Sequence, residues 1–511
     1  MQKNLIIALV LSSLIYIIWF TWVIPPKKTA NLQNPEQYNT KNIQNITEKA
    51  KEAKKIELIE TPKEAKRSNV IYEIKNEKAR YLLNSDLSIN SVIYSGPIQD
   101  IDLIMDKNYP FLSAFGNFDY KKISQTSDSI TVLAKKEIEV TKTLSTSQNN
   151  LMNSLIIEFK NPGKKPYSIP QTEISLGPGL NTVKSEEKEN PELWKSIYSY
   201  NREGRKNPVI EKISSDYNKS DWLWTAIDNR YFLFAVMNNG EFEGLKYFET
   251  NIDGHKAPGV KIITKQFILE PQTTKKIEIK FYSGPKDYSL LKTLGNGLHL
   301  SVDFGFFAPF AKIANSLLKY FYKHTQNYGV AIILLSALIQ IVMYPLSMKS
   351  YKAMGIMKKM QPEMKSIQER YKKDPQRMNA ELMQLYKKYG ANPFSGCWPM
   401  LIQIPIFFAL FTTLRNSWDL HGAKFIFWIK DLSDKDPYYV LPLLMGGLMF
   451  AQNYITPQPV ADNAQASVMK WMPIIFTFLF LTFPSGLVLY WIINSVFSII
   501  QNYYLKKSQA I

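Results

Sequence analysis

Five long runs without a charged side chain constrain the fold of this 511-residue chain more than any other feature. Each is as long as the roughly 20 apolar residues that a helix needs to cross a bilayer core. The last run contains the turn signal Phe483–Gly486, which divides it into two helices. The sequence therefore predicts six transmembrane helices. The runs are Leu5–Ile24, Thr325–Met348, Gly390–Leu414, Tyr438–Ala461 and Trp471–Leu505.

The first run lies at the N-terminus and ends in aromatic side chains. Trp19, Phe20 and Trp22 occupy the region where a signal peptide would carry small residues before a cleavage site. Aromatic residues there are typical of an anchor at the membrane–water interface. We therefore expect residues 1–28 to form a transmembrane helix rather than a cleaved signal. Residues 29–67 are rich in Lys, Glu, Asn and Gln, and we expect a flexible linker.

Positive charges between the runs predict the orientation of the chain. The segment from Lys349 to Lys388 holds eleven Lys or Arg against four acids, which is typical of a cytoplasmic loop. With six helices, both termini then lie in the cytoplasm and the long segment after the first helix lies outside. The net charge of +18 alone would also suit a nucleic-acid partner. Because the charges cluster beside apolar runs, we expect a lipid bilayer as the partner and no DNA.

The outer segment, residues 68–297, contains short runs of β-branched and aromatic residues. Ser129–Leu133 and Tyr231–Val236 are examples, and turn clusters such as Asn161–Gly163 separate them. This texture predicts a β-sandwich. No paired acids or metal-ligand spacing is present, so we expect no enzymatic site, metal or cofactor. Residues 298–324 carry apolar side chains at helical spacing, which predicts an interfacial amphipathic helix. The alternative is a soluble helix packed on the sandwich.

Residues 349–390 have the pattern of an antiparallel helical hairpin. Two stripes of apolar residues at steps of three and four flank Pro375, as in a coiled coil. Pro362 within the first stripe predicts a kink or a restart of that helix. The methionines fit an adaptable partner surface or, equally, the seam of the hairpin itself. The lysines could meet acidic lipid, ribosomal RNA or water. The residues concerned are Met357, Met360, Met364, Lys358 and Lys359.

Polar side chains inside the apolar runs indicate what the helices do. Gln340, Gln403 and Asn494 each interrupt a run. A bilayer core offers no water, so such groups must find partners in the bundle or line a hydrated cavity. They predict a hydrophilic groove within a helical bundle. A channel or small-solute transporter is the alternative, since polar groups also mark ion paths. That alternative requires paired charges at mid-depth or inverted repeats, and the sequence shows neither.

Several long motifs link the chain to a known family. They are Met343–Leu346, Gln361–Met364, Asn392–Leu410, Phe427–Ser433, Asp436–Pro442 and Phe483–Trp491. With these stretches the chain strongly resembles the YidC-type membrane protein insertases from Asp303 to its end. Asn229–Phe232 and Tyr282–Lys286 resemble, more loosely, the large outer domain of the Gram-negative members.

The resemblance implies a fold, a location and a function. The implied fold is a six-helix inner-membrane protein with a periplasmic β-supersandwich. Its last five helices, within residues 325–511, surround a groove open to the cytoplasm and to lipid. The implied function is insertion and folding of newly made membrane proteins, alone or with the Sec translocon, without a nucleotide site. The ribosome is a secondary candidate partner, because the tail after Leu505 lacks the long basic extension of some relatives.

The resemblance also assigns roles to residues of the groove. Most relatives carry an arginine five residues before the proline of the Tyr-Pro-Leu motif, and Gln340 stands there in this chain. Gln340 keeps two hydrogen-bond donors and an acceptor, but no charge. Ser336 matches a hydroxyl position of the family groove. Trp491 matches an aromatic residue that contacts substrate, although it could equally be a packing residue.

Overall fold

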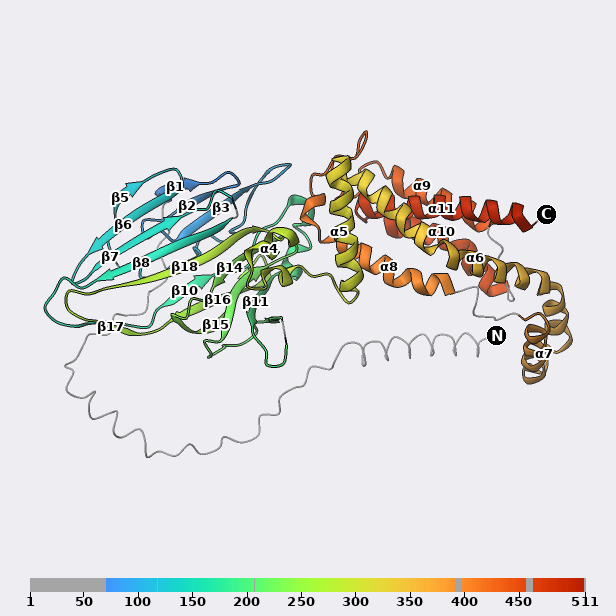
Figure 1. Ribbon diagram of the computed structural model, residues 1–511, viewed down its shortest axis with the longest axis horizontal. Helices are drawn as coiled ribbons and strands as arrows, with labels where there is room; N and C mark the ends of the chain where they lie inside the picture. Colours follow the sequence, from blue (N-terminus) through green and yellow to red (C-terminus); the bar gives the residue numbers. More distant parts are fainter. Residues whose placement is uncertain are drawn as a thin grey trace, which may run out of the picture. The chain divides into compact units, whose positions relative to one another are not determined.

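The computed structural model describes residues 70–116, 118–149, 151–205, 207–390, 398–455 and 463–509. The predicted first transmembrane helix and linker, residues 1–67, lie outside this part of the chain. The described residues begin with a β-rich domain and continue as a set of helices (Figure 1).

The strands of the β-rich domain pair in antiparallel fashion into sheets of nine, four, three and two strands. The nine-stranded sheet has the order β12 (Val209–Lys212), β11 (Lys195–Tyr200), β13 (Trp222–Asp228), β14 (Phe232–Met237), β18 (Thr274–Pro285), β8 (Met152–Lys160), β7 (Glu139–Ser145), β6 (Ser129–Lys135) and β5 (Lys121–Gln125). The smaller sheets are β1 (Tyr72–Lys75), β2 (Ala79–Leu83), β3 (Ile89–Ser95) and β4 (Asp100–Asp102); β10 (Glu173–Leu176), β16 (His255–Thr264) and β15 (Phe242–Ile252); and β17 (Phe267–Leu269) with β9 (Tyr167–Ile169).

Side-chain burial shows how the sheets form a core. Along β6, β7 and β8 every second residue is buried, so one face of these strands points inward. All six residues of β14 are buried, because this central strand is covered on both faces. The rings of Phe111 and Phe234 lie 4.7 Å apart, and Tyr81 of β2 hydrogen-bonds Ser283 of β18 at 2.8 Å. The β-rich character predicted for residues 68–297 is confirmed.

Short helical elements follow or interrupt the strands, and longer helices follow them. The short ones are η2 (Lys184–Glu186), α3 (Asn190–Leu193), α4 (Tyr288–Leu294), η3 (Leu298–Ser301) and η4 (Trp418–Leu420). The longer ones are α5 (Ala308–Thr325), α6 (Tyr328–Arg370), α7 (Pro375–Lys388), α8 (Trp398–Arg415), α9 (Val440–Ile455), α10 (Asn463–Phe480) and α11 (Ser485–Gln509).

Helix α6 is much longer than the second apolar run and continues into the basic hairpin. Asn327 caps its start by accepting hydrogen bonds from the main-chain N–H groups of Gly329 and Val330. Pro345 and Pro362 both lie inside it. The prediction for Pro362 was a kink or a restart. The restart is wrong, because the helix is continuous there, with Met360 and Met364 on either side packed with Leu385 of α7. The kink stays a prediction. The antiparallel partner α7 begins at Pro375, as expected.

Helix α5 begins later than the sequence suggested. The predicted amphipathic helix started near residue 298, but α5 starts at Ala308. Gly305 has a φ of +67°, which a right-handed helix does not allow, and Pro309 suits the first turn of a new helix. The helix packs against α6 and α8, while Phe310 and Ile313 on its other face are exposed.

Apolar length is unequal among the described helices. Only α6, of those described, contains a stretch long and apolar enough by itself to cross a membrane. Shorter apolar helices are Ile402–Arg415, Val440–Ile455 and Trp471–Phe480. The last apolar run is divided between α10 and α11, with the break at residues 481–484, as the Phe483–Gly486 turn signal predicts.

Candidate functional site

The helical part has its own hydrophobic cluster, to which α5, α6, α8, α9, α10 and α11 all contribute. Helix α11 contacts α6, α8 and α9 (Figure 1). The segments 328–348, 402–414, 440–455, 471–480 and 485–504 contain no Asp, Glu, Lys or Arg. Any polar group in this interior therefore depends on neutral hydrogen bonds.

Gln340 and Asn494 form such a bond between α6 and α11. Gln340 is 5% exposed, and its Nε2 donates to Oδ1 of Asn494. Each side-chain amide has two donor hydrogens and an acceptor oxygen, so one mutual bond leaves both amides with further bonding capacity. The structure brings these two predicted groove residues together.

Gln403 makes a second polar bond across the same region. Its Nε2 donates to the hydroxyl of Tyr490 at 2.7 Å, joining α8 to α11. Tyr490 is 1% exposed and lies one helical turn before Asn494. One face of α11 therefore receives an amide from α6 and another from α8. Sequence reasoning missed Tyr490, although its four-residue spacing from Asn494 was a usable signal.

Ser336 and Trp491 are also placed in this interior. Ser336 is buried one turn before Gln340, and its hydroxyl donates to the carbonyl oxygen of Ile332 in the same helix at 2.6 Å. The ring of Trp491 lies 5.4 Å from that of Phe407 and 5.3 Å from that of Phe480. These contacts give Trp491 a packing role, and its contact with a substrate stays a prediction.

The hairpin methionines face the inside of the hairpin. Met360 and Met364 of α6 pack with Leu385 of α7, and Met357 is buried as well. Met360 and Met364 form the hairpin's own seam, the alternative that the sequence left open. Lys358 and Lys359 are exposed on the outer face, free to meet solvent or lipid. Their proposed partners stay predictions.

Comparison with known proteins agrees with these features. Residues 106–315 match the model of the YidC periplasmic domain, and residues 320–510 match that of the 60Kd inner membrane protein family. The membrane protein insertase YidC of Endomicrobium trichonymphae is 36% identical over 524 residues, covering 100% of this chain and 99% of the relative. The chain belongs to the YidC family. The YidC of Geobacter metallireducens is 43% identical over 288 residues, or 56% of this chain and 53% of that one.

Membership in the YidC family has direct consequences for class and location. These relatives are inner-membrane proteins with a periplasmic domain, and the family is not one of enzymes. A solved structure described as an active YidC insertase aligns with a TM-score of 0.41 and 17% identity, covering 87% of this chain and 94% of that one.

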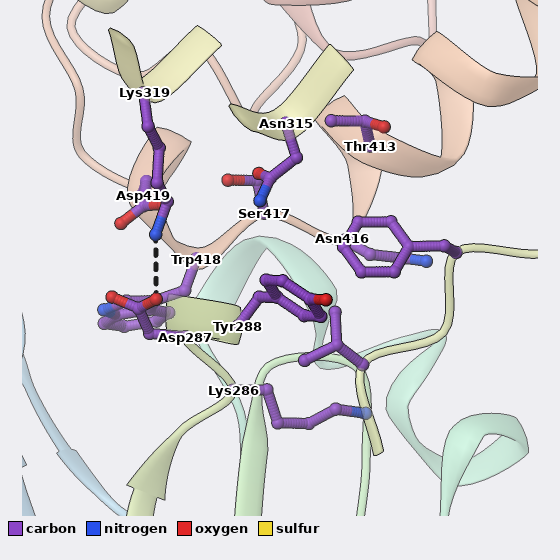
Figure 2. Close-up of a pocket in the computed structure, with 12 residues that line it drawn as sticks. Lys286, Asp287, Tyr288, Asn315, Lys319, Thr413, Asn416, Ser417, Trp418 and Asp419 are labelled. Atoms are coloured by element: carbon purple, nitrogen blue, oxygen red, sulfur yellow. Dashed lines mark hydrogen bonds and ion pairs between the residues drawn. The ribbon is translucent and has the colours of Figure 1, made fainter. Parts of the chain in front are cut away.

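A second polar cluster of this YidC family member joins the β-rich domain to the helices (Figure 2). Lys319 of α5 lies between two carboxylates, 2.8 Å from Asp287 at the start of α4 and 3.0 Å from Asp419 in η4. A small cavity of about 10 Å³ adjoins them, with room for about one water molecule. Trp418 closes one side, with its ring 5.0 Å from Phe232.

The pKa values of the two carboxylates of this cluster are shifted in opposite directions. Burial raises the pKa of Asp419, because desolvation outweighs the attraction of Lys319. Burial also acts on Asp287, but Lys319 and the main-chain N–H groups of α4 outweigh it and lower the pKa of Asp287. Through Lys319, the cluster links Asp287 of the β-rich domain to α5 and η4 of the helical part. Sequence reasoning missed it, because its members are far apart in the chain.

Proposed function

We propose that this chain inserts newly made proteins into the inner membrane and assists their folding, alone or beside the Sec translocon. The proposal rests on membership in the YidC family and on the geometry of the helical interior. It includes six transmembrane helices, both termini in the cytoplasm and the β-rich domain in the periplasm. The expected domain limits are 1–28, 29–67, 68–297, 298–324 and 325–511, with the hairpin at 349–390.

The observation that supports this function most is the pair of polar bonds that converge on α11. Gln340–Asn494 and Gln403–Tyr490 place amides and a hydroxyl inside a charge-free bundle. An incoming polar loop can exchange hydrogen bonds with these groups, and so avoid part of the cost of an unsatisfied polar group in hydrocarbon. In this proposal the groove consists of neutral groups that can exchange hydrogen bonds with an incoming loop.

The driving force comes from the substrate rather than from a nucleotide. As the loop crosses, the following apolar segment passes from water along the bundle into lipid. Removal of its apolar surface from water contributes about 25 cal/mol per Å² buried. The apolar stretch Trp471–Phe480 of α10 is shorter than the roughly 20 residues needed to span an ordinary bilayer, which favours local thinning beside the path.

The neutral amide at position 340 defines the expected substrate preference. A buried cation would attract acidic segments, whereas Gln340 offers donors and an acceptor to any polar segment. Substrates with acidic, neutral or basic outer loops should therefore differ little in their insertion by this chain. Gln340→Arg should favour acidic loops selectively.

A reconstituted insertion assay tests the proposal. The purified chain is placed in proteoliposomes, and a two-span substrate with an acidic or a neutral loop is synthesised in their presence. Protease protection measures insertion, and an ion-flux dye in the same vesicles measures conductance. We expect insertion well above that of empty liposomes, and a several-fold gain for the acidic loop with Gln340→Arg. Leu334→Arg, on the exposed side of α6, is the control.

One result would contradict the proposal, and a second would exclude only its electrostatic part. Ion flux without insertion would support the channel. Equal insertion of both loops by the wild type and by Gln340→Arg would remove the electrostatic part of the argument and leave the exchange of hydrogen bonds.

A further inference from the structure

A tight turn between α8 and α9 exposes a row of aromatic side chains. The main-chain N–H of Phe425 donates to the carbonyl oxygen of Ile429 at 3.0 Å, so residues 426–428 form the tip. Phe427 is 85% exposed and Tyr438 is 68% exposed. The rings of Phe427 and Trp428 stack at 6.0 Å, and Trp428 meets Tyr438 at 6.4 Å. We name Ile426, Phe427, Trp428, Tyr438 and Tyr439 the aromatic ledge.

The backbone of the ledge adopts an unfavourable conformation to present these side chains. Phe427 has a φ of 51° and Tyr439 a φ of 57°, in the left-handed region that favours glycine. A bulky residue there is normally compensated by its contacts. The ring of Phe427 has little of that compensation inside the protein, because most of its surface is exposed.

The ledge is nevertheless held firmly by hydrogen bonds. Asp436 is buried, and its Oδ1 accepts from the indole N–H of Trp428 at 3.0 Å and from the main-chain N–H of Tyr438 at 3.0 Å. Its Oδ2 accepts from the main-chain N–H of Leu441 in the first turn of α9 at 2.7 Å. One carboxylate therefore links both arms of the ledge to a helix. The exposed rings are therefore held in place by the folded chain.

The ledge lies at one end of the apolar helices. The side-chain amide of Asn327, at the start of α6, donates to the carbonyl oxygen of Phe425 at 3.2 Å. The main-chain N–H of Ser485, at the start of α11, donates to the carbonyl oxygen of Asp434 at 2.7 Å. The apolar surface continues from the ledge onto α9, where Leu443 and Leu444 are 62% and 50% exposed. The ledge thus prolongs a lipid-facing helix surface.

Charge around the ledge identifies the partner. Lys424, Lys430 and Lys435 are exposed beside it. Two acids of the same segment are held inside, since Asp431 pairs with His421 at 3.3 Å and Asp436 is buried. Asp434 is partly exposed, and its Oδ1 accepts from the main-chain N–H of Lys435 at 2.7 Å, which leaves three exposed lysines against one partly exposed acid. Aromatic rings with lysines beside them match the interface of a phospholipid layer, where rings lie at headgroup depth and ammonium groups reach phosphates.

We propose that the aromatic ledge inserts into the headgroup region of the outer leaflet and binds anionic phospholipid through the three lysines. This inference rests on the proposed topology, in which this loop lies on the periplasmic side. The ledge fixes the depth of the bundle at its outer end, next to the ends of α6, α9 and α11.

Depth-dependent quenching tests the inference in the full-length chain. Cys397→Ser removes the single cysteine, and an environment-sensitive fluorophore is then attached at Phe427→Cys. The protein is reconstituted in phosphatidylethanolamine–phosphatidylglycerol vesicles that contain nitroxide lipids labelled near the headgroup or deep in the chain. Tyr438→Cys is a second labelling position. Lys256→Cys on the exposed β15–β16 hairpin is the aqueous control, and Leu443→Cys is the lipid-facing control.

We expect the probes at 427 and 438 to be quenched several-fold more by the shallow nitroxide than by the deep one. They should also be several-fold less accessible to iodide than the probe at 256. Quenching should be greater in vesicles with phosphatidylglycerol than in vesicles without it. Replacing Lys424, Lys430 and Lys435 by Gln should reduce this difference.

Iodide quenching at 427 equal to that at 256 would overturn the inference. Protection from both iodide and nitroxide would also overturn it, because the ledge would then be covered by protein. Absence of lipid quenching at 443 would contradict the placement of α9 in the bilayer, and so separates failure of the proposed membrane bundle from failure of the ledge.

Discussion

The β-rich domain buries charged side chains, whereas the interior between α6, α8 and α11 buries neutral ones. In the domain, Lys142 is 1% exposed, and Lys286 forms an ion pair with Asp228 at 2.7 Å. Between these helices, the corresponding buried polar groups are Gln340, Ser336 and Tyr490, and the partly buried Asn494 and Gln403 bond to two of them. The domain folds in water, where charges can be buried together with their partners. A helix that enters lipid carries its polar groups through hydrocarbon, and a charge at its centre costs about 2.5–3.5 kcal/mol.

Lys142 shows how the domain accommodates one such charge. Its ammonium donates to the carbonyl oxygens of Asp86 at 2.8 Å and Ala114 at 2.6 Å, and lies 4.5 Å from the ring centroid of Tyr120. Burial nevertheless lowers the pKa of Lys142 to about 8. A charge is tolerated in this domain because carbonyl dipoles and an aromatic face surround it.

The largest expected effect comes from breaking the buried ion pair. Asp228→Leu leaves Lys286 buried without its counter-charge, and should cost the domain about 3–5 kcal/mol. Urea unfolding of the detergent-solubilised chain, followed by β-sheet circular dichroism, measures this. Lys246→Ala breaks the exposed pair with Glu173 and should cost about 0–1 kcal/mol. Equal losses for the two variants would show that burial does not distinguish the pairs.

Lys142 predicts a smaller, pH-dependent effect. Its pKa is about 8 in the folded chain and 10.5 in the unfolded chain, so between these values the unfolded state binds more protons. The domain should therefore gain stability as the pH rises from about 8 to 10.5, by about 3 kcal/mol in total. The same unfolding assay at both pH values measures the gain. Lys142→Met should remove this part of the pH dependence, and its persistence would rule out Lys142 as the source.

Breaking the amide pair of the bundle should have the smallest effect on stability. Gln340→Leu leaves the amide of Asn494 without its partner, at a cost of about 1–3 kcal/mol. The double variant Gln340→Leu/Asn494→Leu should recover most of that loss, because two apolar groups replace two polar ones. Thermal unfolding measures stability, and the reconstituted assay measures insertion. We expect the double variant to be stable but slower at insertion. Full insertion activity in it would exclude the pair from the path.

Local pattern predicted much of this fold. The β-rich runs Ser129–Leu133 and Tyr231–Val236 predicted strands that the structure shows as β6 and β14, and the Phe483–Gly486 turn predicted the break between α10 and α11. The limits of α5 and α6 were less predictable. A glycine with positive φ delays α5, and packing against α7 carries α6 through Pro362. These effects arise from backbone geometry and tertiary contact rather than from composition.

The candidate site was predictable only in part. Gln340, Gln403 and Asn494 stood out because a polar residue in an apolar run needs a reason. The pairing of Gln340 with Asn494 and of Gln403 with Tyr490 could not be predicted, because it depends on how α6, α8 and α11 are rotated against one another. The Lys319 cluster was not predictable either, because its carboxylates are distant in sequence. Asp287 lies 32 residues before Lys319, and Asp419 lies in the loop between α8 and α9.

Photo-crosslinking from neighbouring positions of α6 tests the central claim most directly. A photoreactive phenylalanine analogue is placed at Gln340, which is 5% exposed, or at Ile341, which is 64% exposed. Synthesis of a small two-span membrane protein is then arrested part-way in vesicles that contain each variant. We expect the nascent chain to be labelled from position 340 and lipid to be labelled from position 341. Labelling of the nascent chain from position 341 but not from position 340 would contradict a path through the interior of the bundle.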